Sequence, residues 1–363
     1  GDPLNGGVPY RFPVCTINLS KDVAEDGTVK LIDEPFVKAV CEHEIYRYNI
    51  LVSKGSKVAS CCRLLSDSDM LDMGGQVNSF RGGGISLGSH RVLTINFNRL
   101  ALEADSPEDY YDRLKARTED ADKILYAHKS MLNKEAEQGI LPFVKSGHIR
   151  MDRMFSTFGV LGLVEAEKTL QRRFGFIEDS PDFIGSSLEL LNAEVSKLSS
   201  AYKITGNIEQ IPAETMAVKL RNADAMLFGE DVSDYPLYAN QFIPLWKNAT
   251  VFERMEADGR YNKKFTGGGI VHFSLGERVT KTQAYRLIKH ASVSGCEHFA
   301  LNSVYSKCAN DHSTFGNHEL CPVCNAQVVE KYTRVVGFMT PLSSWNEIRR
   351  EWEFPKRPFG GID

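Results

Sequence analysis

The sequence lacks the features that mark membrane and secreted proteins. Among its 363 residues, no apolar run approaches the roughly 20 residues that a membrane-spanning helix requires. The N-terminus also lacks a basic stretch followed by an apolar block, so no signal peptide is indicated. We therefore expect a cytoplasmic protein with no membrane partner.

An excess of positive charge is missing as well. The 43 Lys and Arg residues are outnumbered by 47 Asp and Glu residues, which gives a net charge of −4. Proteins that bind DNA or RNA usually carry a basic patch, so no nucleic-acid partner is expected. With 42% hydrophobic and 25% charged residues, the composition is that of a globular protein with one large domain or two ordinary ones.

The eight cysteines are too unevenly spread for a disulfide framework, and no secretion signal accompanies them. Two groups stand out: the adjacent pair Cys61 and Cys62, and the C-terminal group of Cys308, Cys321 and Cys324. The chain also begins with Gly rather than Met. This suggests a processed, split or truncated product, although removal of a tag or of the initiator Met explains it equally.

The hydrophobic pattern predicts strands that alternate with helices, which indicates an α/β fold. The clearest helix begins at Ser106, a residue type suited to the N-cap position, and continues through Pro107 until Gly139. We expect strands at 8–19, 46–53 and 91–98, further helices at 182–202 and 280–293, and a glycine turn at 267–269 that leads into a strand. After about residue 303, the composition changes to that of a small Cys/His-rich tail.

The tail carries the spacing of a tetrahedral metal site. Cys321 and Cys324 form a C-x2-C knuckle, and Cys308 lies a short distance before them. His312, four residues beyond Cys308 in C-x3-H spacing, is our candidate for the fourth zinc ligand, and His318 is the alternative. A metal-free thiol cluster explains the same residues, whereas a zinc ribbon for nucleic acid would need more basic and aromatic residues.

Just beyond these residues, the sequence RVVGF covers 334–338. Glycine has no Cβ, so the Cα of Gly337 can flatten and share an unpaired electron with its flanking amide groups. An isolated glycine of this kind is usually an ordinary turn residue. Together with the Cys/His group, however, the segment 308–346 resembles the C-terminal zinc and glycyl radical region of anaerobic (class III) ribonucleoside-triphosphate reductases.

Three further segments, at 59–64, 88–96 and 211–217, resemble the same family in the same order. The resemblance implies that Cys62, directly before Arg63 on a finger loop around 59–66, becomes the thiyl radical, with Cys61 as its neighbour. It also implies that Ser89 reaches the substrate ribose or a formate-like reductant. A buried cysteine pair and a hairpin that closes into a strand are the structural explanations of these residues.

The segment 211–217 begins a helix, with Pro212 early in its first turn. In the family that it resembles, this segment lies at the substrate phosphates, which would bind the free N–H groups of the helix start. The residues concerned are Pro212, Ala213, Glu214 and Thr215. A plain helix start explains them as well.

The resemblance implies a ten-stranded α/β barrel made of two five-stranded parallel half-sheets, with 1–303 as the barrel portion and 304–363 as the zinc and glycyl radical domain. It further implies a separate activating enzyme, which uses S-adenosylmethionine and an iron–sulfur cluster to remove a hydrogen atom from the Cα of Gly337. The radical would pass to Cys62 and then to the ribose of a ribonucleoside triphosphate, and the 2′-hydroxyl would leave as water.

The sequence departs from the family in two ways. Asp311 stands where the family usually has a cysteine ligand, and the longer N-terminal reductase region, with its nucleotide-sensing segments, lies outside this chain. We therefore expect ATP or dNTP effectors to bind elsewhere, in a complete enzyme that forms a homodimer. Formate or a thioredoxin-like protein would be the reductant. The alternatives are another glycyl radical enzyme, such as a pyruvate formate-lyase relative, or a non-catalytic fragment that complements a split reductase.

Overall fold

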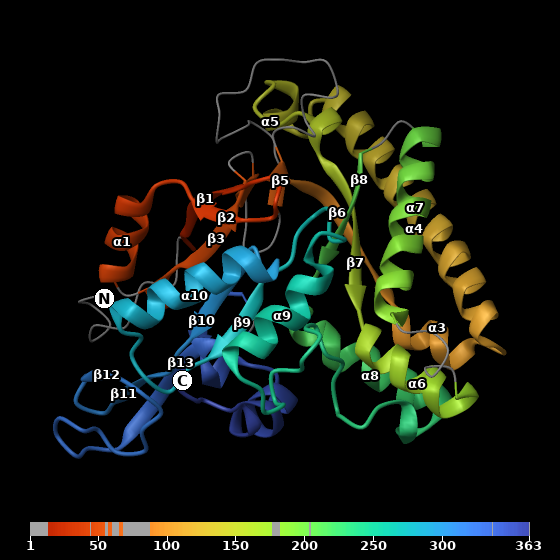
Figure 1. Cartoon of the computed structure of the whole chain (residues 1–363). Helices are drawn as coiled ribbons and strands as arrows, with labels where there is room; N and C mark the ends of the chain where they lie inside the picture. The colour runs from red at the N-terminus through yellow and green to blue at the C-terminus, as the bar shows by residue number, and fades with distance from the viewer. Residues whose placement is uncertain are drawn as a thin grey trace. The chain divides into compact units, whose positions relative to one another are not determined.

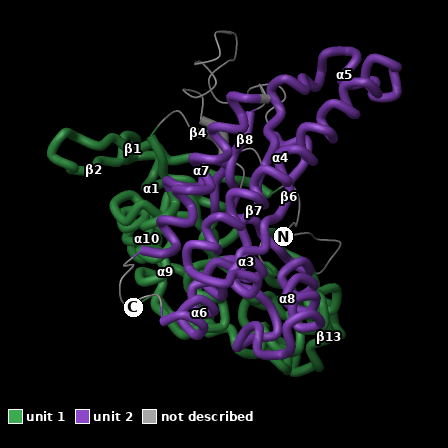
Figure 2. The backbone as a smooth tube through the Cα atoms, turned by 90° about the vertical axis from the view of Figure 1, so that its right-hand side faces the viewer, with its two compact units in different colours: residues 1–55, 241–262, 270–363 green, residues 56–240, 263–269 purple. Residues whose placement is uncertain are grey.

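The computed structural model describes residues 14–43, 45–54, 57–59, 65–67, 88–175, 182–202, 205–335 and 337–362. The chain forms two compact units, which Figure 2 distinguishes by colour. Unit 1 contains residues 1–55, 241–262 and 270–363, and unit 2 contains residues 56–240 and 263–269. Within the described ranges, no helix is both long and apolar enough to cross a membrane.

Unit 1 is built on a mixed five-stranded sheet with the order β2-β1-β3-β10-β9. The pairs β1/β3 and β9/β10 are parallel, whereas β3 and β10 run antiparallel. The strands are β1 (Thr16–Val23), β2 (Val29–Leu31), β3 (Asn49–Ser53), β9 (Val271–Ser274) and β10 (His298–Asn302). Two strand–helix–strand crossovers therefore meet at the centre of the sheet.

The helices of these crossovers cover the sheet. They are α1 (Glu34–Glu42), which follows β2, and α10 (Lys281–Ser294), with α9 (Val251–Asn262) beside α10 (Figure 1). Every residue of β3 is buried, because it is the central strand, and its Ile50 and Val52 side chains join those of the helices in one core. The short 3₁₀ turn η2 (Ile45–Arg47) leads into β3, so this strand begins three residues later than the sequence predicted.

Unit 2 contains a parallel sheet of three strands in the order β6-β7-β8. They are β6 (Ser89–Asn96), β7 (Phe155–Leu161) and β8 (Gly206–Gln210), and a further parallel bridge joins Glu209 to Gly268. The helices are α3 (Phe97–Glu103), α4 (Pro107–Glu137), α5 (Pro142–Lys145), α6 (Leu163–Phe174), α7 (Phe183–Tyr202) and α8 (Glu214–Phe228), with the 3₁₀ turns η3 (Met151–Arg153) and η5 (Glu230–Val232). The short antiparallel strands β4 (Lys57–Ala59) and β5 (Leu65–Asp67) also belong to this unit.

The predicted helices are confirmed where local capping signals were strong. Helix α4 begins at Pro107, and the Ser106 hydroxyl accepts a hydrogen bond from the backbone N–H of Asp109. Helix α10 begins after Thr280, which forms a capping box with Gln283. In both helices the cap lies within four residues of the start, so the sequence alone contains the signal.

The C-terminal part of unit 1 is a four-stranded antiparallel sheet with the order β12-β11-β13-β14. Its strands are β11 (Tyr305–Cys308), β12 (Ser313–Phe315), β13 (Val328–Arg334) and β14 (Met339–Pro341). The chain then forms the 3₁₀ turn η6 (Leu342–Ser344), the π-helix η7 (Ile348–Glu353) and the 3₁₀ turn η8 (Phe354–Lys356).

The α/β architecture is confirmed, but the sheets differ from the two five-stranded parallel halves that the sequence led us to expect. Across the described residues the main sheets have five and three strands, no closed barrel is present, and the five-stranded sheet is mixed. The reason is that each βαβ crossover makes its own strands parallel, whereas the contact between the two crossovers, β3 with β10, is antiparallel.

Candidate functional site

The four predicted metal ligands lie together. The ligand atoms of Cys308, His312, Cys321 and Cys324 are all within 4.8 Å of one another. The two sulfur atoms of Cys308 and Cys324 are 3.7 Å apart, and Nδ1 of His312 is 3.9 Å from the sulfur of Cys321. Tetrahedral zinc would place two sulfurs about 3.8 Å apart, and a sulfur and a nitrogen about 3.6 Å apart. The geometry and the donor types therefore fit zinc.

Two tight turns create this cluster. In the first, the N–H of Cys308 donates to the carbonyl of His312, and Asp311 has a left-handed φ of 62°. In the second, the N–H of Asn325 donates to the carbonyl of Cys321, and Asn325 itself has a φ of 59°. Asp and Asn tolerate this conformation better than most residues do. Asp311, which stands where the family usually has a cysteine, is therefore the residue at which the first turn reverses.

The surroundings of the cluster favour a thiolate at Cys324. The backbone N–H of Ala326 and the ring of His312 lower the pKa of Cys324 from 9.0 to about 6. Burial raises the pKa of Cys308. Thiolates, rather than thiols, bind zinc, so the site contains one cysteine that is ready to bind and another that the metal itself would deprotonate.

His318, the alternative fourth ligand, is outside the cluster. Its Nε2 lies 2.9 Å from the carbonyl oxygen of Phe315, and its backbone N–H donates to the hydroxyl of Ser306. Its ring packs against Gly316, where even a Cβ atom would lie 2.6 Å from Nε2. His318 thus closes the turn after β12, and the cluster contains His312 instead.

Gly337 lies in the hairpin loop between β13 and β14. The last paired residues before and after this loop are Arg334 and Met339. Gly337 is buried, which is unusual for a hairpin loop, because buried backbone groups need hydrogen-bond partners. The guanidinium of Arg334 provides one: its Nη1 donates to the carbonyl of Gly337 at 3.0 Å and also to Oδ1 of Asn49 at 2.7 Å.

Cys61 and Cys62, the predicted thiyl pair, lie outside the described residues. The described strands on either side of them, β4 and β5, pair antiparallel, with Ala59 opposite Leu65. The glycine-rich stretch that follows β5 also lies outside the described residues.

Ser89 is the first residue of β6 and belongs to a row of polar side chains that crosses the sheet of unit 2. Its hydroxyl makes a short hydrogen bond with the hydroxyl of Thr157, which donates to Oδ1 of Asn207 at 2.6 Å. Nδ2 of Asn207 is buried and has no hydrogen-bond partner among the described residues. The three side chains come from β6, β7 and β8. Thr157 and Asn207 are partners in the parallel register, whereas Ser89 lies opposite Phe155, beside a register shift in β6.

Next to Ser89 lies a histidine pair that the sequence analysis missed. Nδ1 of His90 is 3.1 Å from Nδ1 of His128, and Nε2 of His90 is 2.8 Å from the Ser156 hydroxyl. Burial, and then the positive charge of Lys129, lower the pKa of His90 to about 4. His90 is therefore neutral at pH 7 and cannot act there as a cation. His128 lies on α4, so the spacing of 38 residues gave no sequence signal.

The predicted phosphate-binding segment begins α8, but not as the sequence suggested. Helix α8 starts at Glu214, so Pro212 lies before the helix rather than in its first turn, while Thr215 lies in that turn. Ala213 is the N-cap residue, with a left-handed φ of 53°, and within the described part of the chain no side chain caps the helix. The carbonyl of Pro212 accepts a hydrogen bond from Asn240.

The structure does not bring Ser89 and this segment together. Ser89 lies at the amino end of the parallel sheet, because it begins β6, whereas Pro212 follows the carboxyl end of β8. Eight residues of extended strand separate the two edges by roughly 20 Å. Any ligand at one edge therefore lies a strand length away from the other.

Glu165, on α6, is a second titratable residue that the sequence did not reveal. Its carboxylate accepts a hydrogen bond from the backbone N–H of Ala239 at 2.9 Å, and its second oxygen has no partner among the described residues. Burial raises the pKa of Glu165 from 4.5 to about 7. Glu165 thereby holds the backbone beside Asn240, which contacts the Pro212 carbonyl.

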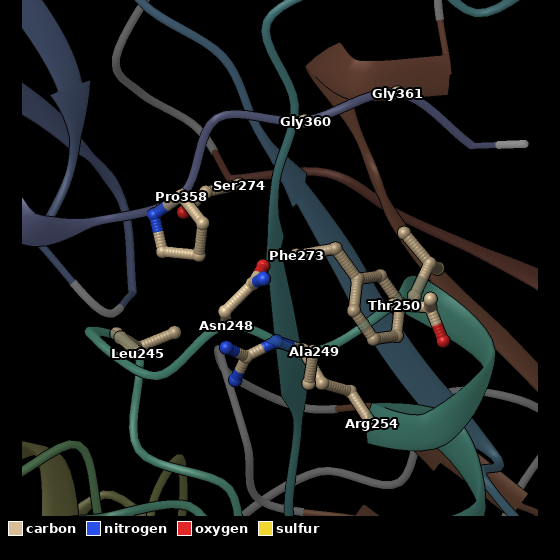
Figure 3. Close-up of a pocket in the computed structure, with 11 residues that line it drawn as sticks. Leu245, Asn248, Ala249, Thr250, Arg254, Phe273, Ser274, Pro358, Gly360 and Gly361 are labelled. Atoms are coloured by element: carbon tan, nitrogen blue, oxygen red, sulfur yellow. The ribbon is translucent and has the colours of Figure 1, made fainter.

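A small pocket of about 140 Å³ lies elsewhere in unit 1 (Figure 3). The start of α9, the end of β9 and the C-terminal residues Gly360 and Gly361 line it. The guanidinium of Arg254 borders the pocket but donates to the carbonyls of Ile243 and Lys247. None of the predicted site residues that the structure describes lines this pocket.

Comparisons with known proteins agree with one another. The family model described as anaerobic ribonucleoside-triphosphate reductase matches residues 1–359. A solved structure described as an anaerobic ribonucleotide reductase is 31% identical, with a TM-score of 0.80 over 97% of this chain and 55% of its own. No curated protein sequence matches.

Structures of the anaerobic ribonucleotide reductase from Thermotoga maritima are also similar. The structure with glycerol in the active site is 30% identical, with a TM-score of 0.77 over 95% of this chain and 56% of its own. The structure in complex with dATP and CTP is 30% identical, with the same TM-score over 96% of this chain and 57% of its own. The present chain thus spans little more than half the length of the structures that it matches.

Proposed function

Because the chain belongs to the anaerobic ribonucleoside-triphosphate reductase family, we propose that it is the radical-bearing part of an enzyme that reduces ribonucleoside triphosphates to deoxyribonucleoside triphosphates. The observation that carries this proposal is the buried Gly337 in the loop between β13 and β14, directly beyond a cluster with the geometry of a zinc site. A glycine in such a loop combines the chemistry of a radical store with protection from solvent.

Gly337 is the radical residue in this proposal. A separate activating enzyme removes one hydrogen atom from its Cα, using S-adenosylmethionine and an iron–sulfur cluster. Cys62 then gives its thiol hydrogen to Gly337 and becomes a thiyl radical. Sulfur suits this step, because the S–H bond and a ribose C–H bond are similar in strength, so hydrogen transfer runs in both directions.

The thiyl radical removes the 3′-hydrogen of the ribose, and the 2′-hydroxyl leaves as water. This loss of oxygen requires two electrons, which formate or a thioredoxin-like protein supplies. We propose that the start of α8, at Pro212, Ala213, Glu214 and Thr215, binds the phosphates. The first N–H groups of α8 form the positive end of the helix dipole, and no side chain caps the helix in the described structure.

Ser89 is proposed to contact the ribose or the reductant. A separation of roughly 20 Å between Ser89 and the start of α8 is larger than the distance from the ribose to the phosphates of one nucleoside triphosphate, so with the phosphates at α8 the reductant is the partner that fits Ser89. Cys61 is proposed to assist Cys62 without carrying the radical itself.

Zinc is proposed to be held by Cys308, His312, Cys321 and Cys324. When bound, it would supply structural cross-linking, with four protein ligands and no open position for chemistry. The ligands come from β11 and from the two segments between β11 and β13, so the metal would tie the base of the hairpin that ends in the Gly337 loop.

The complete enzyme is proposed to have the ten-stranded barrel of the family. Support comes from the parallel pairings of β6 with β7, β7 with β8, and β9 with β10. A parallel bridge also joins Glu209 to Gly268, three residues before β9 begins. The region of the relatives that this chain does not span would complete the barrel, bind ATP or dNTP effectors and support a homodimer.

The oxygen sensitivity of a backbone radical provides the test. We expect activated protein, supplied with the remaining reductase region, to give a doublet electron paramagnetic resonance (EPR) signal and to be cut at Gly337 when exposed to air. Gly337→Ala should lose both the signal and the cut, because a methyl group disfavours the planar radical. Gly360→Ala is the matched control, since a Cβ at Gly360 meets no atom within 4 Å. If activated wild-type protein is not cleaved in air and gives no EPR doublet, the proposal is contradicted.

A further inference from the structure

The residues that hold the Gly337 loop in place come from the last segment of the chain. Arg357, which follows η8, donates through Nη1 to the carbonyl of Arg334 at 2.8 Å and through Nη2 to the carbonyl of Val335 at 2.6 Å. The first carbonyl belongs to the last residue of β13, and the second belongs to the first residue of the loop. The contacts span 22 and 23 residues of sequence, so no local pattern predicts them.

Arg357 is itself anchored by a buried carboxylate. Its Nε and Nη2 donate to Oε1 of Glu353 at 3.0 and 2.6 Å, and Arg349 pairs with the other carboxylate oxygen of Glu353. The guanidinium of Arg357 also lies 4.9 Å from the ring centre of Trp345. Arg349, Glu353 and Arg357 are all buried and follow one another at intervals of four residues.

Such an arrangement makes Arg357 a rigid support. A planar guanidinium that is bonded to a carboxylate on one edge has its remaining N–H groups pointing in fixed directions. Here those groups point at two consecutive carbonyls where β13 enters the loop. Within the loop, the side chain of Arg334 holds the carbonyl of Gly337. Two guanidinium groups therefore fix the backbone before Gly337 and at Gly337 itself.

We propose that Arg357, anchored by Glu353, is a positioning residue for the radical loop. By holding the carbonyls of Arg334 and Val335 it keeps Arg334 aligned on the carbonyl of Gly337, and so keeps the glycine planar and closed to oxygen once it carries the radical. The effect on the radical rests on the proposed function. The hydrogen bonds by which Arg357 holds the loop, which we call the Arg357 clamp, can be tested without a radical.

The first experiment measures amide hydrogen exchange in the unactivated chain, so it needs no radical. Arg357→Lys keeps the charge but cannot reach the carboxylate and both carbonyls at once. Since hydrogen bonds to charged groups are lost, we expect exchange in the loop peptide 334–338 to become about tenfold faster or more, while exchange around 308–324 stays unchanged. Glu353→Gln should have the same effect, because it removes the anchor with little change of shape.

Arg221→Lys is the matched control. Arg221, on α8, likewise donates to one carboxylate, that of Glu230, and to two carbonyls, those of Glu230 and Tyr235, but it lies in unit 2. Its replacement should leave the exchange of 334–338 at the wild-type rate. Loop exchange that is unaltered in both Arg357→Lys and Glu353→Gln, or that rises equally throughout unit 1, overturns the clamp.

The second experiment measures the radical. In activated Arg357→Lys, we expect an altered splitting of the glycyl doublet and cleavage in air at Gly337 that is about tenfold faster or more, because the loop opens more often. A wild type with no radical refutes the proposed function but leaves the exchange result standing. A variant with faster loop exchange but an unchanged doublet and an unchanged cleavage rate refutes the positioning role.

Discussion

Replacing one of two nearby histidines tests the zinc site most sharply. His312 and His318 lie six residues apart, one before β12 and one after it, but only His312 belongs to the cluster of ligand atoms. We expect His312→Gln to weaken zinc binding strongly and His318→Gln to leave it nearly unchanged. Glutamine is chosen for both positions because it is a poor zinc ligand, and because at His318 it can still donate a hydrogen bond to the Phe315 carbonyl.

The size of the effect follows from the geometry. Replacing a residue that merely orients a zinc ligand typically lowers zinc affinity 10- to 100-fold. Replacing a ligand itself should therefore lower zinc affinity more than about 100-fold. In His312→Gln three sulfur ligands remain, and water can take the fourth position, so binding is weakened but not abolished. The affinity of His318→Gln should stay close to that of the wild type, because His318 is not among the clustered ligand atoms.

The measurement is a competition between the protein and a chromophoric zinc chelator under anaerobic conditions, with thiols kept reduced. Total zinc by elemental analysis should give about one ion per chain for the wild type. The ligand assignment is wrong if His318→Gln loses zinc and His312→Gln keeps it. If elemental analysis finds no metal in the native protein, the zinc site as a whole is wrong.

Three further predictions concern catalysis and stability. With the radical installed, Cys62→Ser should keep the glycyl signal but make no deoxynucleotide, whereas Cys61→Ser should retain turnover; the opposite result moves the thiyl radical to Cys61. Because burial raises the pKa of Glu165 from 4.5 to about 7, its contribution to stability is present below pH 4.5 and is lost as the pH rises to about 7, a change of about 3 kcal/mol. Urea unfolding of wild type and Glu165→Gln at several pH values should show this loss only in the wild type, and parallel curves would contradict it. Gly259→Ala should destabilise the chain by about 2 kcal/mol, since its Cβ would lie 2.1 Å from the carbonyl at the end of α10. In thermal melts the control Gly360→Ala should behave like wild type, because its Cβ meets no atom within 4 Å. An equal loss of stability in both variants would contradict the packing explanation.

The sequence determined the parts of this protein that depend on neighbouring residues. Helix α4 could be predicted because its cap, its first-turn acids and its apolar stripe all lie within the helix or directly before it. The metal cluster could be predicted for the same reason, since a C-x2-C knuckle and a C-x3-H turn each bring two ligands together within a few residues. The resemblance to a family then led to the roles proposed for Gly337 and Cys62.

Contacts between distant segments were decided by the tertiary structure alone. The antiparallel meeting of β3 with β10 joins strands that lie more than 200 residues apart, and it made the main sheet mixed rather than parallel. The left-handed Ala213 shifted the start of α8 past Pro212, although nothing in its side chain signals that conformation.

The same holds for the charged residues in the interior. Glu165 and Arg357 look in the sequence like ordinary surface residues, since Glu and Arg are seldom fully buried. Only the fold shows that each one bonds to backbone groups far away in the chain: Glu165 to Ala239, and Arg357 to the strand that enters the Gly337 loop. The physical reason is that a buried backbone group must find a partner, and which distant side chain provides it is fixed by packing rather than by sequence spacing.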